Sequence, residues 1–439
     1  MKSYLRLIGA LLGAFAFTAA AGPLRVGAAR VDITPAADAS LPMGGYGGRT
    51  QGFRAIHDNI YVRAVVIDDG TTQAALVAWE LLFVPDAVWQ ETSKRVAAET
   101  GIQPENLLLS AVHDHGAPTP TLAENAPKSA AYTRTVEQAA VEAIRQAKAK
   151  LQPARFGIGI GTAYVNINRR EAYPDRGLWL GYNQEGPSDK TVTVLRFDNL
   201  SGKPIAFWIN YSVHAVVMGP ENLLVTGDLA GATSRFVEQH FARKDHPRSD
   251  AGPRLRLRSE DLTDGDVIAV WTSGAAGDQN PVSMVNGEDF GMVDALGQIL
   301  GEAAVRAASG VTTSADIKIR SGQEVVTCPG RRVEPGPTPR AEYRFDDTDP
   351  VGIRLGLLML NDVALAGVSG EVFTLIAQRL KGESPIRHTI MVTHTNGSSG
   401  YIPNDAAFEP VSYEVTASRL KPGCAEGAIV GGFLKMMQR

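Results

Sequence analysis

Cysteine is almost absent from this chain, with only Cys328 and Cys424 among 439 residues. Two thiols so far from the histidines discussed below argue against a zinc site built from cysteine thiolates, which gathers several of them around one ion. In an oxidising compartment the two cysteines could form one disulfide. The sequence alone does not show that they meet in space.

Strong charge and long internal apolar runs are also missing. The formal net charge is -4, which provides no electrostatic case for binding nucleic acid. Beyond the N-terminus no stretch is long and apolar enough to cross a membrane. With 44% hydrophobic and 21% charged residues, the chain has an ordinary globular composition and is long enough for one large domain or two modest ones.

The N-terminus has the pattern of a secretory signal. Lys2 and Arg6 precede an apolar run over residues 7–17 and a small-residue segment that ends at Ala21. A charged segment, a short apolar segment and a small-residue cleavage site are typical of a signal peptide. We therefore expect a signal peptide over residues 1–21 and a periplasmic or secreted mature protein. An N-terminal membrane anchor is the alternative, and the short run disfavours it.

Short apolar and β-branched runs alternate with segments of helical periodicity along the rest of the chain. This pattern predicts an α/β fold, with a central mixed β-sheet and flanking helices. The segment 166–173 is polar and predicts a loop, and the Pro-, Gly- and charge-rich segment 322–349 predicts a surface excursion within one domain. The expected strands are 26–31, 60–67, 74–79, 107–112, 155–161, 192–197, 205–213, 267–272, 353–360, 363–368 and 388–394; the expected helices are 87–100, 129–151, 229–241, 290–309 and 372–380.

The most informative stretch is an apolar run over residues 107–112 that ends in His113, Asp114 and His115. In an extended chain, residues two apart face the same side, so both histidines would point together out of the carboxyl end of a strand. Ligands of open α/β sheets lie beyond those ends, and neutral histidine is a favoured zinc ligand. For this motif alone, two histidines in a polar turn remain the alternative.

Other expected strands also end next to polar side chains. His214 closes one of them, and Glu371 follows another at the start of a helix. Two histidines and a carboxylate form the ligand set of a catalytic zinc with an open position for water, so the sequence predicts a zinc site at the strand ends. A carboxylate stabilised by the helix dipole is the alternative for Glu371. For Asp228, which precedes a helix, an N-cap is the favoured interpretation.

The ordered set of motifs resembles the N-terminal catalytic domain of the neutral/alkaline ceramidases, zinc-dependent amidases that cleave the N-acyl bond of ceramide. The resemblance extends from about Val26 to Tyr413. The motifs are His113-x-His115-Gly-x-Pro118, Asn166-x-Asn168-Arg169, Asn210-Tyr211-x-x-His214, Gly227-Asp228-x-x-Gly231, Gly277-Asp278-x-x-Pro281, Gly370-Glu371 and Asn396-x-x-x-Gly400-Tyr401.

The resemblance implies roles for individual residues. It implies that zinc is held by four ligands: His113, His214, Glu371 and Tyr401. It places His115 beside the metal, where it hydrogen-bonds substrate or water and assists proton transfer. It makes Arg169 a donor that orients the substrate and, with Tyr401, stabilises the developing oxyanion. Tyr413 is the alternative to Tyr401 in this alignment.

The chain departs from the family pattern at three places. Asn280 stands where the family carries a serine held to be essential, and Asp114 stands where the family has threonine. A neutral amide is not a nucleophile, so a serine-based mechanism is excluded at position 280, although Asn280 could donate a hydrogen bond to an oxyanion. The chain also ends soon after Tyr413. We therefore expect a single domain over residues 22–439, without the C-terminal immunoglobulin-like domain of full-length ceramidases.

Together these features predict a zinc-dependent hydrolase that cleaves an amide, or an ester, of a small molecule or lipid by means of metal-activated water. The expected catalytic residues are His115, Arg169, Asn280 and Tyr401. The alternative is a relative, non-catalytic or of esterase type, that kept the zinc pocket and lost ceramidase activity. Asn280 favours this alternative, whereas the intact set of His113, His214 and Glu371 favours the enzyme.

Overall fold

The computed structural model describes residues 23–49, 51–242, 267–334, 336, 338–340 and 342–439. The expected signal peptide over residues 1–21 lies outside them. Among the helices of the described ranges, none has both the length and the apolar character that crossing a membrane requires.

The largest sheet has eight strands in the order β12-β10-β9-β6-β1-β3-β4-β5. It is mixed, as expected from the sequence, because the two edge pairs, β4 with β5 and β10 with β12, are parallel and the other pairs are antiparallel. Its strands are β1 (Arg25–Asp32), β3 (Tyr61–Asp68), β4 (Gln73–Trp79), β5 (Leu107–Ala111), β6 (Gln152–Thr162), β9 (Thr191–Asn199), β10 (Pro204–Tyr211) and β12 (Ile268–Ser273).

This sheet is folded into two stacked halves. The halves are joined where β1 pairs with β6, and the pairing there involves only Arg25 with Pro153 and Val26 with Gln152. Buried apolar side chains from both halves, such as Leu76 and Phe207, belong to one cluster. The fold therefore places two layers of strands face to face, with the main core between them.

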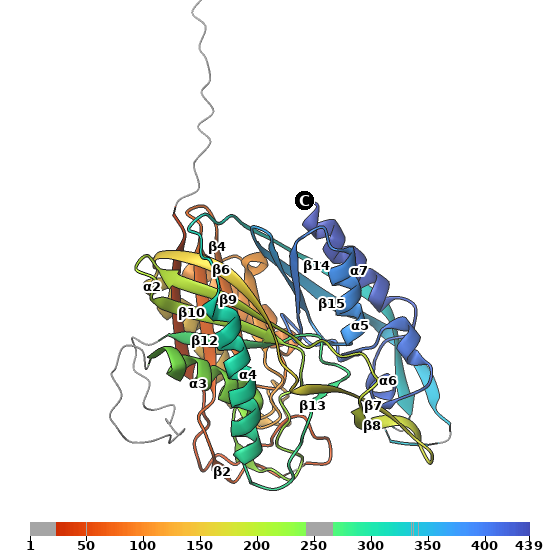
Figure 1. Ribbon diagram of the computed structural model, residues 1–439. Coiled ribbons are helices and arrows are strands. Elements are labelled where there is room, and N and C mark those ends of the chain that lie inside the picture. Colours follow the sequence, from red (N-terminus) through yellow and green to blue (C-terminus); the bar gives the residue numbers. More distant parts are fainter. Residues whose placement is uncertain (1–22, 50, 243–266, 335, 337, 341) are drawn as a thin grey trace, which may run out of the picture.

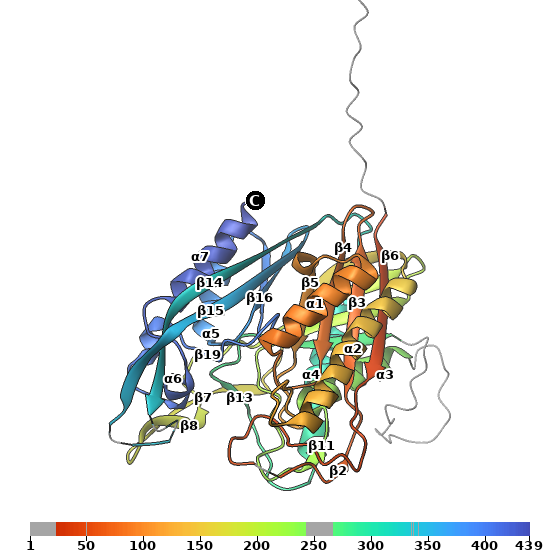
Figure 2. The same cartoon turned by 180° about the vertical axis from the view of Figure 1, so that it is seen from behind.

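Helices cover the two outer faces of this pair of layers. The helices α1 (Asp86–Thr100) and α2 (Pro127–Ala149) lie over the half that contains β3 and β4 (Figure 2). The helices α3 (Asp228–Ala242) and α4 (Gly291–Ser309) lie over the other half (Figure 1). Helix α1 ends at Gly101, which has a φ of 77°, a conformation that glycine adopts without steric cost. The predicted helices of this region are confirmed, within a few residues at each end.

A second sheet lies beside this body, in the order β14-β15-β16-β18. Its strands are β14 (Ile319–Glu334), β15 (Arg344–Leu360), β16 (Val363–Val368) and β18 (His388–Val392). Apolar side chains such as Leu365 extend the main core, and those on the opposite face pack with helices α5 (Thr374–Glu383) and α7 (Ala425–Met437). Buried side chains of the two sheets thus belong to one core, and the single domain expected from the sequence stays a prediction.

Two expectations about this part of the chain have clear outcomes. Cys328 in β14 and Cys424 next to α7 form a disulfide. The prediction of a surface excursion over residues 322–349 was wrong, because most of this segment forms the long antiparallel ribbon of β14 and β15. Paired backbone explains how so polar a sequence remains ordered, since each strand satisfies the backbone hydrogen bonds of the other.

Three small sheets complete the described part of the fold. They pair β2 (Ala55–Ile56) with β11 (Leu224–Val225), β7 (Asn166–Tyr173) with both β13 (Gln279–Pro281) and β8 (Gly177–Asn183), and β17 (Glu371–Val372) with β19 (Tyr401–Ile402). Short helices are formed by Pro104–Asn106, Asp405–Phe408 and α6 (Tyr413–Ala417). The prediction of a loop over residues 166–173 was wrong. The side chains of Asn166, Asn168 and Arg169 are buried, and Asn168, for example, donates to Asp278 at 3.0 Å.

Candidate metal centre

The first histidine of the site follows β5 directly. The backbone at His113 has a φ of 63°, so the chain turns sharply here and does not continue as the extended strand that the sequence predicts. The Nδ1 atom of His113 lies 2.9 Å from the carbonyl oxygen of Leu82. A carbonyl only accepts, so Nδ1 carries the proton and the lone pair of Nε2 points into the site, the arrangement typical of a metal-binding histidine.

His214, which follows β10, is held in the same way. Its Nδ1 lies 2.8 Å from the carbonyl oxygen of Ala276, which leaves Nε2 unprotonated toward the site. Burial and the neighbouring Arg169 guanidinium lower the pKa of His214 to about 3. The imidazole is therefore neutral near pH 7, the state in which histidine binds a metal.

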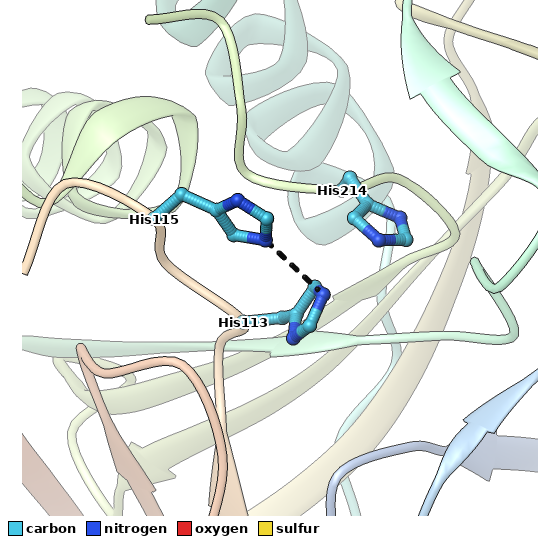
Figure 3. A group of neighbouring side chains, drawn as sticks. All are labelled: His113, His115 and His214. Atoms are coloured by element: carbon cyan, nitrogen blue, oxygen red, sulfur yellow. Dashed lines mark hydrogen bonds between the residues drawn. The ribbon is translucent and has the colours of Figure 1, made fainter. Parts of the chain in front are cut away.

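The ring of His115 completes a group of three imidazoles (Figure 3). Its Nε2 lies 3.4 Å from Nε2 of His113, and burial lowers the pKa of His115 well below its usual value. The glycine-rich segment 44–48 passes directly over this ring. At Gly45 the φ is 88°, and a Cβ atom there would lie 2.0 Å from Nδ1 of His115. Glycine at this position thus permits the close backbone approach that encloses the ring.

The carboxylate comes from the second sheet. Glu371 lies in β17, and its Oε2 atom is 3.4 Å from Nε2 of both His113 and His214. Its buried Oε2 accepts no hydrogen bond from any described residue, which agrees with imidazoles that carry their proton on Nδ1 and offer none from Nε2.

These atoms fit a divalent cation. An anionic oxygen and two imidazole nitrogens without a proton converge here, and none of the three supplies a proton to the others, although Nε2 of His214 accepts a hydrogen bond from Arg169 at 3.1 Å. Such an arrangement is unfavourable without a positive charge between its members. Nitrogen atoms of His113, His115 and His214 lie within 4.8 Å of one another. The donor set of imidazole and carboxylate suits zinc.

Tyr401 lies beside the carboxylate because β17 and β19 are parallel neighbours in which Glu371 pairs with Tyr401. Burial raises the pKa of Tyr401 well above its usual value, although Arg169 opposes this effect. The ring of Tyr413 lies 5.8 Å from that of Tyr401, edge to face. The register favours Tyr401 as the tyrosine next to the metal position, and its role as a ligand stays a prediction.

Arg169 in β7 connects the outer part of the site. It is buried and donates from Nη2 to the Tyr401 hydroxyl at 2.9 Å and from Nη1 to Nε2 of His214 at 3.1 Å. Its Nε donates to Glu414 at 2.8 Å. Every nitrogen of the guanidinium thus has a partner, and its charge lies directly against the proposed ligands.

Asn280 in β13 faces the same place. Its Oδ1 atom accepts a hydrogen bond from Arg169 at 3.4 Å, and its Nδ2 donates to the sulfur of Met284 at 3.5 Å. The family serine position is therefore at the site, as expected, and holds an amide whose donor is engaged only weakly. All the predicted site residues are thus brought together within one buried group.

Two site residues were not predicted from the sequence. The ring of His394 stacks on that of His113, with centroids 4.0 Å apart and planes at 14°. His394 follows an apolar strand just as His214 does, so the same signal could have identified it. Glu414 is buried beneath Arg169, and no local pattern in the sequence indicates that role.

Two aspartates near the site, Asp228 and Asp114, use their carboxylates to accept hydrogen bonds from backbone amides. The carboxylate of Asp228, the first residue of α3, accepts hydrogen bonds from the backbone amides of Leu229, Val217 and Met218. It therefore ties the preceding loop to the start of the helix, and the N-cap interpretation stays a prediction. The side chain of Asp114 accepts from the Gly116 amide at 2.6 Å. Burial raises the pKa of Asp114 well above its usual value.

A comparison with protein families agrees with this geometry. A family model described as neutral/alkaline non-lysosomal ceramidase, N-terminal, matches residues 24–291. The chain belongs to this family. The matched range contains His113, Arg169, His214 and Asn280, whereas Glu371 and Tyr401 lie beyond it.

Individual relatives are less than one third identical to this chain over the residues that align. The neutral ceramidase of Drosophila melanogaster is 29% identical over 228 residues, which are 49% of this chain and 32% of that protein. Neutral ceramidase A of Dictyostelium discoideum is 30% identical over 234 residues, with the same coverage of 49% and 32%. The matched region thus spans about a third of the length of these relatives.

The fold is similar over a much longer range. The crystal structure of neutral ceramidase from Pseudomonas aeruginosa matches with a TM-score of 0.75 and 19% identity, covering 94% of this chain and 74% of that one. A structure described as a ceramidase complexed with C2 matches with a TM-score of 0.77, again at 19% identity, covering 94% and 75%. The chain therefore has the neutral ceramidase fold, and this includes the second sheet.

Proposed function

We propose that this protein is a zinc-dependent hydrolase that cleaves the N-acyl bond of an amide. The observation that carries the proposal is the convergence of His113, His214 and Glu371, whose unprotonated atoms approach one another to 3.4 Å at Glu371. With Tyr401 beside the carboxylate, these residues would hold zinc. Bound there, zinc would supply a water with a pKa of about 7 and a Lewis acid for the scissile carbonyl.

The remaining residues suit the other requirements of amide hydrolysis. His115 is buried, neutral and adjacent to His113, so it can accept and return a proton beside the attacked carbonyl. Arg169 and Tyr401 place a cation and a hydroxyl on the outer side of the site, where they stabilise the oxyanion. The amide of Asn280 adds a donor in place of a serine hydroxyl, so that attack comes from water.

A non-catalytic or esterase-type relative is the second candidate, because Asn280 replaces the family serine. A protein that only binds a ligand needs neither ionised Glu371 facing two imidazoles nor backbone carbonyls that fix both tautomers. These features favour the enzyme. The disulfide between Cys328 and Cys424 supports the proposed periplasmic or secreted location, because disulfides persist in oxidising compartments.

The test is a hydrolysis screen of zinc-loaded protein across ceramides, short N-acyl amides and esters of matched acyl chains. We expect turnover of an amide, its loss after chelation, and its return on addition of zinc. Ceramide and short amides are compared by kcat/KM in the same detergent, which identifies the substrate class. The amide proposal is wrong if the zinc-loaded protein hydrolyses esters alone, and the enzyme proposal is wrong if it hydrolyses nothing.

A further inference from the structure

Glu414 is a buried charge that the proposed chemistry does not use. It lies in α6, and its side chain is 1% exposed. Its Oε1 accepts from Nε of Arg169 at 2.8 Å, and its Oε2 accepts from the Ser412 hydroxyl at 2.9 Å. Arg170 is a more distant cation, with Nε 3.9 Å from Oε2. A buried carboxylate with this set of donors is costly to assemble and is held in one position.

Two anionic groups act on the Arg169 guanidinium, and they have opposite consequences. One is Glu414, which it contacts through Nε. The other is Glu371, whose charge also acts on the Arg169 guanidinium. An arginine forms its strongest contacts with carboxylates. If Arg169 paired with Glu371, it would occupy the oxygen that faces His113 and His214.

The positive charge of Arg169 also bears on cation binding directly. Its Nη1 lies 3.1 Å from Nε2 of His214, so an unneutralised guanidinium would repel any cation held by that nitrogen. In a buried site, charges at such distances interact strongly because little water screens them. Glu414 supplies the opposite charge from the side of the guanidinium that faces away from His214.

We propose that Glu414 is a positioning residue for Arg169: it neutralises the guanidinium and anchors Nε, so that Glu371 stays available to zinc and the Nη atoms face the reacting group. The role in the reaction rests on the proposed function, whereas the role in zinc binding does not require turnover. Groups that orient metal ligands from outside the coordination sphere typically change metal affinity by about 10-fold to 100-fold when removed.

The experiment measures zinc affinity by competition with a chromophoric chelator for the full chain and its folded variants. We expect Glu414→Gln to weaken zinc binding by about tenfold, because the charge of Arg169 is then uncompensated. In an Arg169→Met background the same change should alter affinity by less than about twofold. A purely structural role of Glu414 would weaken binding equally in both backgrounds, which would overturn the proposal.

Two further variants sharpen this cycle. Ser412→Ala removes a neutral hydrogen bond to the same carboxylate and should keep zinc affinity close to that of the parent chain. Glu414→Asp keeps the charge with a shorter reach, so it should recover most of the affinity lost in Glu414→Gln. Zinc binding by Glu414→Gln as tight as in the parent refutes the inference.

The outcome is separable from that of the proposed function. A parent chain that binds zinc through an Arg169-dependent effect of Glu414, yet hydrolyses no substrate, would refute the enzyme and leave the inference standing. If the parent chain hydrolyses its substrate normally but Glu414→Gln changes zinc affinity equally in the parent and Arg169→Met backgrounds, the enzyme proposal stands and the inference is refuted. A parent chain that binds no zinc would overturn both.

Discussion

The two sheets contribute to the site in different ways. The loops that follow strands of the eight-stranded sheet bring His113, His115 and His214, and backbone carbonyls hold two of these imidazoles. The loops associated with the four-stranded sheet bring Glu371 and Tyr401, which are aligned by the short pairing of β17 with β19. The proposed metal position therefore lies between the two sheets, with the candidate nitrogen ligands on one side and the candidate oxygen ligands on the other.

This difference has a parallel in the comparisons with other proteins. The family match ends at residue 291, before β14 begins, while the structural match covers 94% of the chain. The half that supplies the imidazoles retains recognisable sequence, and the half that supplies the carboxylate retains the fold.

The largest expected effect comes from removing an imidazole of the first sheet. His214→Ala should reduce bound zinc far below one equivalent per chain, because a site with so few protein ligands does not tolerate the loss of one. Metal analysis after dialysis measures this. His388→Ala, at the start of β18 and outside the cluster, is the matched control and should retain zinc. Full zinc content in His214→Ala would rule out the proposed centre.

A second perturbation acts on the side that supplies the carboxylate. Replacing both Cys328 and Cys424 by serine opens a disulfide that joins residues 96 apart. We expect the free energy of unfolding to fall by about 2–4 kcal/mol, as measured by urea denaturation of the oxidised parent and the double variant. Zinc that binds only the folded state adds the same free energy to both proteins if their zinc affinities are equal, so the loss should be the same with and without zinc. A free energy of unfolding that is unchanged in the double variant would contradict the prediction.

The third prediction concerns Asn280, which lies on the imidazole side. Asn280→Ala should lower kcat by roughly 10²-fold if its amide stabilises the oxyanion, while Asn280→Ser should stay within about tenfold because water remains the nucleophile. Steady-state kinetics on the amide identified by the screen test both variants at equal zinc content. Unchanged turnover in Asn280→Ala would remove this residue from the mechanism.

The fourth prediction is a dependence of stability on pH. Burial lowers the pKa of His115, His214 and His394, in His214 to about 3, whereas an unfolded histidine titrates near 6.5. As the pH falls below about 6.5, the unfolded state takes up protons before the folded state does, so stability is present above that pH and is lost toward pH 3. Each such histidine contributes about 1.4 kcal/mol per pH unit.

Metal-free protein, unfolded by urea at several pH values, measures this slope. Replacing His394 by glutamine should reduce the slope by the contribution of one proton, since His394 stacks on His113 and loses its proton on folding. A stability that is independent of pH between about 4 and 6.5 would contradict the prediction.

Much of the site was predictable because a strand ending in a polar residue is a local pattern. His113, His214 and Glu371 follow apolar runs, and the family motifs brought in Tyr401, Arg169 and Asn280. The failures have physical reasons as well. The segments 166–173 and 322–349 are polar and lack the apolar alternation of a strand, so the sequence predicts loops there. In the structure both segments pair with other strands, and this pairing satisfies their backbone hydrogen bonds.

The sequence by itself determined the mixed α/β class, the elements that carry the imidazoles and the residue types available for a zinc site, because each depends on spacing within about ten neighbouring residues. Only the tertiary structure decided that Cys328 meets Cys424, that Gly45 covers His115 and that Glu414 holds Arg169 across 245 positions. These contacts join segments remote in the chain. Burial in a shared core brings them together, and no local spacing encodes such a distance.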